Sequence, residues 1–254
     1  GTKLYAFVGG IVVVVFVIFG IYMYNILKSN IDSSYQESIQ EYLNNYTQMI
    51  NLEINSKKDN AEVSINLLQN YLKTLGSISI MPNEYVTINN QQVNKWLING
   101  KQVQNSEEIP NKSTEMGIEL MSIFQKFPGG YFRIATSVMD DKGKRAVGSV
   151  IPYDSPVAQA IERGERYIGR NQVLGVWLIA AYEPLKINGQ IVGIIAVAQP
   201  EMNYTALAED FKTKKYFGSG YPYIVDENGI MTAHPRSTGN SLAEYDFFKE
   251  MKEK

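Results

Sequence analysis

Residues 131–150 read YFRIATSVMDDKGKRAVGSV, residues 153–170 read YDSPVAQAIERGERYIGR, and residues 177–197 read WLIAAYEPLKINGQIVGIIAV. The first and third stretches consist of short apolar runs separated by a Gly with Asn or Asp close by, in DDKGK (140–144) and INGQ (187–190). Glycine takes a positive φ without strain, so both places predict hairpin turns between antiparallel strands. The predicted order is strand, turn, strand, helix, strand, strand, turn, strand.

A short helix is predicted inside this stretch. Asp154 or Ser155 suits the N-cap, Pro156 suits the first helical position, and Gly164 suits the end. The sequence VAQAIERGE fills the helical turns between them.

Composition excludes several classes of function. The 254 residues carry a net charge of -2, which gives no electrostatic reason to expect a nucleic-acid partner. There is no cysteine and only one histidine, His234, so thiolate and multi-histidine metal sites are excluded. No phosphate-binding Gly-rich loop and no Ser/His/Asp arrangement are present. We therefore expect no enzyme, no metal and no cofactor, and we expect His234 to close a turn through its side chain.

Residues 4–27 are almost wholly apolar, and a helix of this length can cross the roughly 30 Å hydrocarbon layer of a membrane. A cleaved signal peptide is the alternative, but Tyr22, Tyr24 and Lys28 suit an interfacial belt and the helix pattern continues beyond them. We predict a transmembrane anchor over residues 1–28, with Lys3 on the cytoplasmic side.

Residues 29–76 predict one long amphipathic helix that ends at Gly76. Its apolar positions are Ile31, Tyr35, Ile39, Tyr42, Tyr46, Ile50, Ile54, Ala61, Ile65, Leu68, Leu72 and Leu75. The distal half should pack on its own domain. Nearer the membrane, the Tyr and Ile stripe favours a homodimer seam over packing within one chain.

The remaining segments are read from their turns and periodicity. Residues 84–112 suggest small strand and turn pieces at the periphery, and residues 114–127 suggest a short helix that ends at Pro128. Residues 202–215 suggest a connecting helix, followed by a hairpin turning at residues 227–229 and a helix over residues 244–252. A single hairpin with one helix covers too little apolar surface to be a stable domain, so the sequence is expected to stop inside a second domain.

Four segments, in this order, resemble the sensor region of bacterial methyl-accepting chemotaxis proteins and related sensor kinases, specifically the Cache 3/Cache 2 fusion type of double Cache domain. They are VTINNQQVNKWLINGK, residues 130–170, AAYEPLKINGQIVGIIAV and GYPYIVDENGIMTAHP. The resemblance implies an α+β fold of PAS-like modules with central antiparallel sheets. It implies a membrane-distal module over residues 77–200 and the start of a membrane-proximal module, incomplete here, over residues 201–254.

Two positions depart from the family pattern. Leu178 stands where an aromatic residue usually follows Trp177, and Ala198 follows Val197 where the family usually has Gly. Since the first change alters the pocket, the resemblance does not specify the ligand.

Five residues in or beside the strands of the distal module are candidates for ligand binding: Arg133, Arg145, Tyr167, Trp177 and Tyr182. An arginine inside an apolar strand needs a partner, which is either a small carboxylate ligand or a carboxylate of the protein. Trp177 and Tyr182 suit the core as well as a pocket wall. By strand alternation Tyr131, Arg133, Ala135 and Ser137 share one face, so Thr136 can join Arg133 only across a bulge.

The primary hypothesis is an extracytoplasmic ligand-sensing domain of a chemoreceptor or sensor kinase in the bacterial cytoplasmic membrane. It would bind a small molecule, such as an organic acid or amino acid, and pass a conformational signal along the long helix of a homodimer. The alternative is a structural subunit of a pilin-like assembly that packs through its apolar N-terminal helix, although Tyr5 stands where common pilins have a glutamate.

Overall fold

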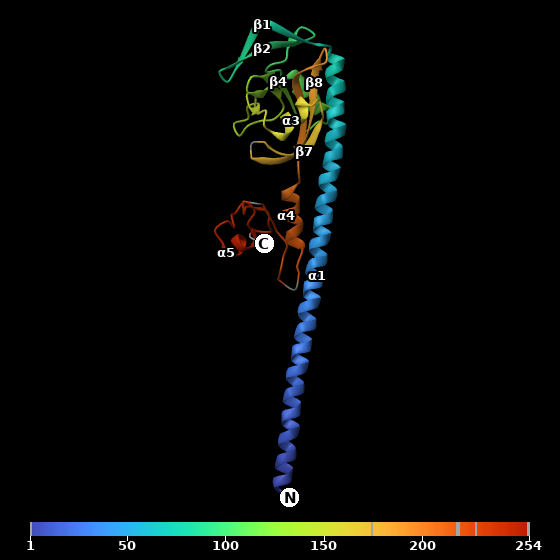
Figure 1. Ribbon diagram of the computed structural model, residues 1–254, viewed down its shortest axis with the longest axis vertical. Helices are drawn as coiled ribbons and strands as arrows, with labels where there is room; N and C mark the ends of the chain where they lie inside the picture. The colour runs from blue at the N-terminus through green and yellow to red at the C-terminus, as the bar shows by residue number, and fades with distance from the viewer. Residues whose placement is uncertain (1, 174, 217–218, 227, 253–254) are drawn as a thin grey trace. The chain divides into compact units, whose positions relative to one another are not determined.

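The computed structural model describes residues 2–173, 175–216, 219–226 and 228–252, with the side chains of residues 2–22, 24, 27, 29–32, 251 and 252 left out. The chain divides into two units, Gly1–Glu53 and Ile54–Lys254. One helix, α1 (Thr2–Leu75), begins in the first unit and continues into the second (Figure 1). It ends where predicted, because Gly76 takes a φ of 114° that a helix cannot continue.

Among the described residues, no helix carries an apolar stretch long enough to cross a membrane. The predicted anchor over residues 1–28 falls outside the described side chains except at Met23, Asn25, Ile26 and Lys28.

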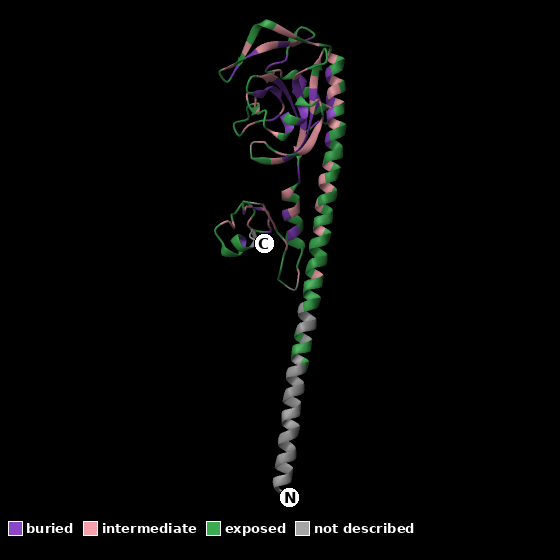
Figure 2. Ribbon diagram, in the orientation of Figure 1, coloured by how far each residue is buried: buried purple, intermediate pink, exposed green. Residues whose placement is uncertain are grey.

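The two parts of the α1 stripe differ in exposure. In the second unit Ala61, Ile65, Leu68 and Leu72 are buried against the sheet described below, which confirms the predicted packing of the distal half. Figure 2 shows this part of the helix carrying its buried residues on one face. In the first unit Tyr35, Ile39 and Tyr42 are exposed, with 46% of Tyr35 accessible to solvent, whereas Tyr46 and Ile50 are partly buried.

A six-stranded antiparallel sheet forms the centre of the second unit, in the order β6-β5-β4-β9-β8-β7. Its strands are β4 (Leu120–Phe127), β5 (Gly130–Thr136), β6 (Val150–Ile151), β7 (Tyr167–Val173), β8 (Val176–Ile187) and β9 (Gln190–Pro200). From β5 to β9, the predicted succession of elements along the chain (strand, turn, strand, helix, strand, strand, turn, strand) is confirmed. The INGQ hairpin between β8 and β9 is also confirmed, with Asn188 and Gly189 at φ 50° and 80°.

The DDKGK segment forms a turn but not a long hairpin. Asp140 Oδ1 accepts hydrogen bonds from the backbone N–H groups of Lys142 and Lys144, at 2.9 and 2.8 Å. Beyond the turn only Met139 and Arg145 form a bridge, and the chain then runs on to β6. Residues 140–144 therefore determine the turn itself, whereas the length of the flanking strands depends on their pairing within the sheet.

The prediction of a helix over residues 114–127 is wrong. A shorter helix, α2 (Glu108–Glu115), precedes this segment, and residues 120–127 form β4 at the centre of the sheet. Residues 121–125 are all buried, because β4 is covered on both faces and pairs with β5 and β9 on both edges. A short apolar run of this kind fits a buried strand as well as a helix face.

A bulge interrupts β5. Ile123 pairs with Ala135 and Phe124 pairs with Arg133, so Ile134 is an extra residue with no partner in β4. The alternation of side chains between the two faces of the sheet is consequently broken at Ile134 and resumes after it. Arg133 and Thr136 lie on the same face, as the sequence allowed only with a bulge, and Ala135 lies on the opposite face rather than beside Arg133.

The small sheet of β1 (Ile78–Ile88), β2 (Gln91–Ile98) and β3 (Lys101–Gln102) confirms the predicted strand and turn pieces but is not peripheral. Trp96 of β2 is fully buried in the same core as Ile65 and Ile195. Its ring lies over Gly193, where an added Cβ would stand 2.8 Å from the ring and 2.2 Å from the Phe124 carbonyl oxygen. Only glycine allows β9 to approach both neighbours this closely.

The opposite face of the sheet is covered by α3 (Pro156–Glu162). The helix forms as predicted: Ser155 Oγ accepts a hydrogen bond from the backbone N–H of Ala158 at 3.1 Å, and Gly164 follows the last turn at φ 79°. Val157 and Ile161 bury their side chains against Phe124 and Tyr182. The sheet is thus packed between α1 on one face and α3 on the other.

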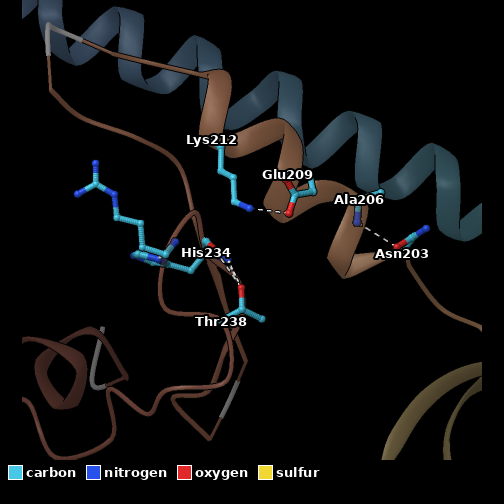
Figure 3. Close-up of polar contacts among 7 residues, drawn as sticks. Asn203, Ala206, Glu209, Lys212, His234 and Thr238 are labelled. Carbon is cyan, nitrogen blue, oxygen red and sulfur yellow. Dashed lines mark hydrogen bonds and ion pairs between the residues drawn. The ribbon is translucent and has the colours of Figure 1, made fainter.

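The C-terminal segment contains α4 (Tyr204–Thr213), β10 (Ile224–Val225), β11 (Met231–Ala233) and α5 (Asp246–Lys252). These confirm the predicted connecting helix, hairpin and final helix, although the two strands are shorter than the sequence suggested. The N-cap of α4 is Asn203, whose Oδ1 accepts a hydrogen bond from Ala206 N at 3.0 Å (Figure 3).

Candidate ligand-binding site

A cavity of about 370 Å³ lies on the α3 side of the sheet. Its polar lining includes Arg133 of β5, Ser149 before β6, Ser155 before α3, Tyr167 and Asn171 of β7, and Tyr182 of β8. Arg170 and Gln172 of the edge strand β7 also border the cavity, but their side chains alternate to the opposite face of the sheet. Three of the five predicted site residues, Arg133, Tyr167 and Tyr182, therefore meet in one cavity. Their part in binding stays a prediction.

Arg133 is a buried cation without a carboxylate partner in the described part of the chain. It is 7% exposed, its Nη1 donates a hydrogen bond to the Ala146 carbonyl at 3.3 Å, and its Nε has no partner. The guanidinium carbon lies 5.1 Å from the centre of the Phe124 ring. Burial lowers the pKa of Arg133 because a charged guanidinium is poorly solvated there.

Two tyrosines stand beside this cation. Tyr167 and Tyr182 occupy paired positions on β7 and β8, with ring centres 6.2 Å apart. The Tyr182 hydroxyl accepts a hydrogen bond from Asn171 Nδ2 at 2.6 Å. Burial raises the pKa of Tyr182, against the opposing effects of this hydrogen bond and of the Arg133 charge, so the hydroxyl keeps its proton and remains a donor.

Arg145 and Trp177 do not line this cavity. Arg145 donates hydrogen bonds to the Thr136 carbonyl at 2.6 Å and to Asn111 Oδ1 at 2.7 Å, and so ties the loop after β5 to α2. Trp177 stacks under Arg170, whose guanidinium carbon is 3.7 Å from a ring centre. Both residues support the walls of the module from outside the cavity.

A larger hollow of about 450 Å³ lies between the C-terminal end of α1 and the β8–β9 turn. Lys73 and Lys186 line it, and both side chains are exposed. Among the described residues, the buried side-chain atoms without a hydrogen-bond partner are Trp96 Nε1 and Arg133 Nε, and neither residue lines this hollow. We place the candidate site at Arg133, because size alone does not supply a binding group.

The model of the Cache 3/Cache 2 fusion domain matches residues 24–254. The chain belongs to this family. It is a Cache sensor domain, and family membership favours the sensory hypothesis over the pilin-like alternative.

Several solved structures resemble this Cache domain. They include the ligand-binding domain of Mlp24 with asparagine, at 16% identity and TM-score 0.44, covering 86% of this chain and 78% of that one. The ligand-binding domain of the Pseudomonas aeruginosa PAO1 amino acid chemoreceptor PctC, in complex with GABA, has 15% identity and TM-score 0.37, with 79% and 80% covered. That of the Pseudomonas fluorescens chemoreceptor CtaA with L-isoleucine has 16% identity and TM-score 0.33, with 82% and 76% covered. No curated protein matches the chain.

Arg170 and Asn171 of this Cache domain were not predicted as site residues. Both lie on β7, the edge strand of the sheet, in the sequence YIGRN. The pairing of Tyr167 with Tyr182 places Arg170 opposite Ile179 and Asn171 opposite Leu178. Once the β7–β8 register is known, Asn171 is a candidate because it shares the face of Tyr167 and Tyr182, whereas the Arg170 side chain lies on the opposite face with Ile179. The sequence alone does not give that register.

His234 closes a turn, as predicted. Its Nδ1 accepts hydrogen bonds from the backbone N–H groups of Arg236 and Ser237 at 3.0 and 2.9 Å. The backbone N–H of His234 donates to Thr238 Oγ1 at 3.0 Å, and the Thr238 hydroxyl donates back to the His234 carbonyl (Figure 3). Both hydrogen bonds to Nδ1 require that atom to be unprotonated.

The stability of this turn should therefore depend on pH. Burial, and then the Arg236 charge, lower the pKa of His234 below its ordinary 6.5. The unfolded chain takes up a proton near pH 6.5 and the folded turn only at lower pH, so the folded form loses stability as the pH falls through about 6.5. We expect amide protection of residues 231–239 to decrease between pH 7.5 and 5.5, measured by hydrogen exchange corrected for the intrinsic pH dependence. His234→Asn should remove the dependence, and an unchanged pH profile in that variant would contradict the assignment.

Proposed function

We propose that this Cache domain senses a small carboxylate outside the cytoplasm, as the input domain of a membrane chemoreceptor or sensor kinase. The carboxylate binds in the cavity beside Arg133, and the bound state is passed to the rest of the receptor. The proposal covers the ligand class, the site residues and the membrane location, all of which go beyond family membership.

The unpaired Arg133 carries this proposal. A buried guanidinium is costly unless its N–H groups are hydrogen-bonded and its charge is compensated. Here one N–H donates to a carbonyl and Nε donates to nothing, so the domain keeps a cation whose partner must come from elsewhere. A planar carboxylate matches the fork of donors on a guanidinium.

The other lining residues suit an organic acid better than an amino acid. The described lining contains the cation of Arg133 but no Asp or Glu to receive an ammonium group. Tyr167, Asn171 and Tyr182 offer neutral hydrogen-bonding groups, and Val150 and Val157 offer apolar surface. We therefore rank short organic acids, with or without a hydroxyl or keto group, above amino acids.

Leu178 contributes to the shape of the site. Together with Phe124, Arg133 and Tyr182 it lines a recess of about 20 Å³ next to the main cavity. The family usually has an aromatic residue at this position, and a larger ring there would fill the recess. The leucine therefore leaves room for an extra methyl-sized group of a ligand beside Arg133.

A thermal-shift screen of the 254-residue chain tests the proposal. The panel is acetate, pyruvate, L-lactate and succinate, with L-alanine and L-asparagine as amino acids and acetamide and propionamide as uncharged controls. At a concentration of about 100 times Kd, binding should add about 2.7 kcal/mol and raise Tm by several degrees. The amides should have no effect. The proposal fails if no carboxylate raises Tm, or if the amides raise it equally.

The homodimer is part of the same proposal. In the first unit Tyr35, Ile39 and Tyr42 are 46, 40 and 41% exposed along one helical stripe, which supports a second copy of α1 as the partner. Because the chain has no cysteine, a single introduced one reports specifically.

We expect Ile39→Cys to form a disulfide-linked dimer under mild oxidation, whereas Glu37→Cys should not. Glu37 follows Tyr35 and precedes Ile39 by two residues each, which places it about 160° around the helix from both. The readout is the dimer band on non-reducing gel electrophoresis. Equal cross-linking of the two variants would argue against the seam.

A further inference from the structure

Two hydrogen-bond donors in the candidate cavity have no acceptor in the described part of the chain. Nε of Arg133 is buried and has no partner. The Tyr182 hydroxyl accepts a hydrogen bond from Asn171 Nδ2 at 2.6 Å, but no described residue accepts the proton of that hydroxyl. Arg133 and Tyr182 line both the cavity and the small recess beside it, so one ligand there can accept from both.

The direction of the Tyr182 hydrogen bond follows from the other end of the Asn171 amide. Asn171 Oδ1 accepts from the backbone N–H of Gln172 at 2.9 Å, so Nδ2 is the atom that faces Tyr182. An amide nitrogen is a donor and not an acceptor, so the Tyr182 hydroxyl cannot donate to it. The hydroxyl proton is therefore left for the cavity.

Both donors lie on the α3 face of the sheet. Tyr182 and Phe124 belong to the cluster buried against α3, and the Arg133 guanidinium carbon lies 5.1 Å from the centre of the Phe124 ring. Tyr131 belongs to the same cluster, and Arg133 follows it by two residues ahead of the bulge, so their side chains share a face. The two donors therefore open on the same side of the sheet.

Small side chains form the floor between the two donors. Arg133 is on β5 and Tyr182 on β8, with β4 and β9 between them, which corresponds to about 14 Å between the two backbones. Tyr182 pairs with Ala196 of β9, and Ala196 pairs with Ser122 of β4. Ser122 and Ala196 line the recess together with the two donors. The long side chains thus face a common space over a floor that leaves room for a ligand.

We infer that the ligand carries an uncharged oxygen on the carbon next to its carboxylate, as 2-oxo and 2-hydroxy acids do, and that Tyr182 selects for this oxygen. The inference rests on the proposed function, because it takes the carboxylate to be the group that binds Arg133. The oxygen on C2 then accepts the hydrogen bond that Tyr182 donates.

A separate acceptor explains the two donors better than one carboxylate does. The fork of a guanidinium engages both oxygens of a carboxylate. A simple acid could meet Tyr182 only by sharing an oxygen that already accepts from Arg133. A buried donor that stays unpaired when a ligand binds lowers the affinity, so the site should discriminate against acids that lack the second oxygen.

The first test compares pyruvate with propionate, which has the same number of carbons and no oxygen on C2. Isothermal titration of the 254-residue chain should give an affinity about ten-fold higher for pyruvate, and L-lactate should also bind more tightly than propionate. Equal affinities would overturn this inference and leave the proposed function standing. If no carboxylate binds, the proposed function and this inference fail together.

Tyr182→Phe tests the role of the hydroxyl. It keeps the ring and removes the donor, so pyruvate should bind about ten-fold more weakly and propionate as in wild type. Tyr153→Phe is the matched control, because the Tyr153 hydroxyl donates to the Phe127 carbonyl at 2.9 Å and does not line the cavity. It should keep both affinities. An equal loss of pyruvate and propionate binding in Tyr182→Phe would mean that Tyr182 donates to the carboxylate, and would overturn the inference.

Asn171→Asp gives an independent test if Tyr182→Phe does not fold, as judged by far-UV circular dichroism. The aspartate has the shape of asparagine but accepts the Tyr182 proton, which is then lost to the ligand. The added negative charge weakens both acids, so the readout is the ratio of the two affinities. The ratio of pyruvate to propionate affinity should fall to about one, and a ratio that stays at the wild-type value would overturn the inference.

Discussion

Arg133→Met is expected to weaken carboxylate binding and, at the same time, to raise the stability of the ligand-free domain. The guanidinium supplies charge-assisted hydrogen bonds worth about 1.5–3 kcal/mol, so its loss should raise Kd about 10- to 150-fold. In the ligand-free domain the same group is a buried cation with an unpaired Nε. Replacing an uncompensated buried charge by an apolar side chain of similar length should add about 1 kcal/mol or more to the free energy of unfolding.

The measurements are isothermal titration with the carboxylate that gives the largest thermal shift, and urea unfolding without ligand. Arg145→Met is the matched control, because Arg145 is also an arginine near the sheet but has its guanidinium bonded to Thr136 and Asn111. It should lose stability and keep its affinity. Loss of stability in Arg133→Met would mean that Arg133 serves the fold rather than a ligand.

Trp96→Ala is expected to have the largest effect on folding, about 3–5 kcal/mol. The indole is fully buried and joins the small sheet to β9 across Gly193, so its removal leaves a cavity between two sheets. For a domain of this size the loss corresponds to a decrease in Tm of about 6–20 °C.

Chemical unfolding followed by far-UV circular dichroism measures this effect. Tyr85→Ala is the control on the same small sheet, since Tyr85 is 59% exposed and should change stability by less than about 0.5 kcal/mol. Trp96→Phe should cost less than the volume change suggests, because it also removes the unpaired Nε1–H. Equal stability of the two alanine variants would show that the small sheet does not share the core.

Features that depend only on residues adjacent in the sequence were predictable from it. Gly76 ends α1, Ser155 and Pro156 start α3, and Asn188 with Gly189 turns β8 into β9, because each relies on a cap or a positive φ that its own residues provide. β4 was not predictable in this way. The buried apolar run of β4 is compatible with the periodicity of a helix and with that of a strand, and it forms a strand because it pairs with β5 and β9 on its two edges.

The same distinction applies to the site. Arg133 could be singled out because an arginine in an apolar strand is unusual wherever the strand lies, and it is buried at the cavity, although its part in binding stays a prediction. The roles of Arg145 and Trp177 could not, since Arg145 bonds to Asn111 and Trp177 stacks with Arg170, and both partnerships follow from the register and loop path.

The bulge in β5 has an evolutionary consequence. Ile134 pairs with no residue of β4, so a relative lacking one residue at this point of the strand would still present Arg133 and Thr136 to the same side. A deletion at Phe132 would instead turn Tyr131 to the opposite side. We therefore expect strand length among homologues to vary at the position of Ile134 and to be constant on its N-terminal side.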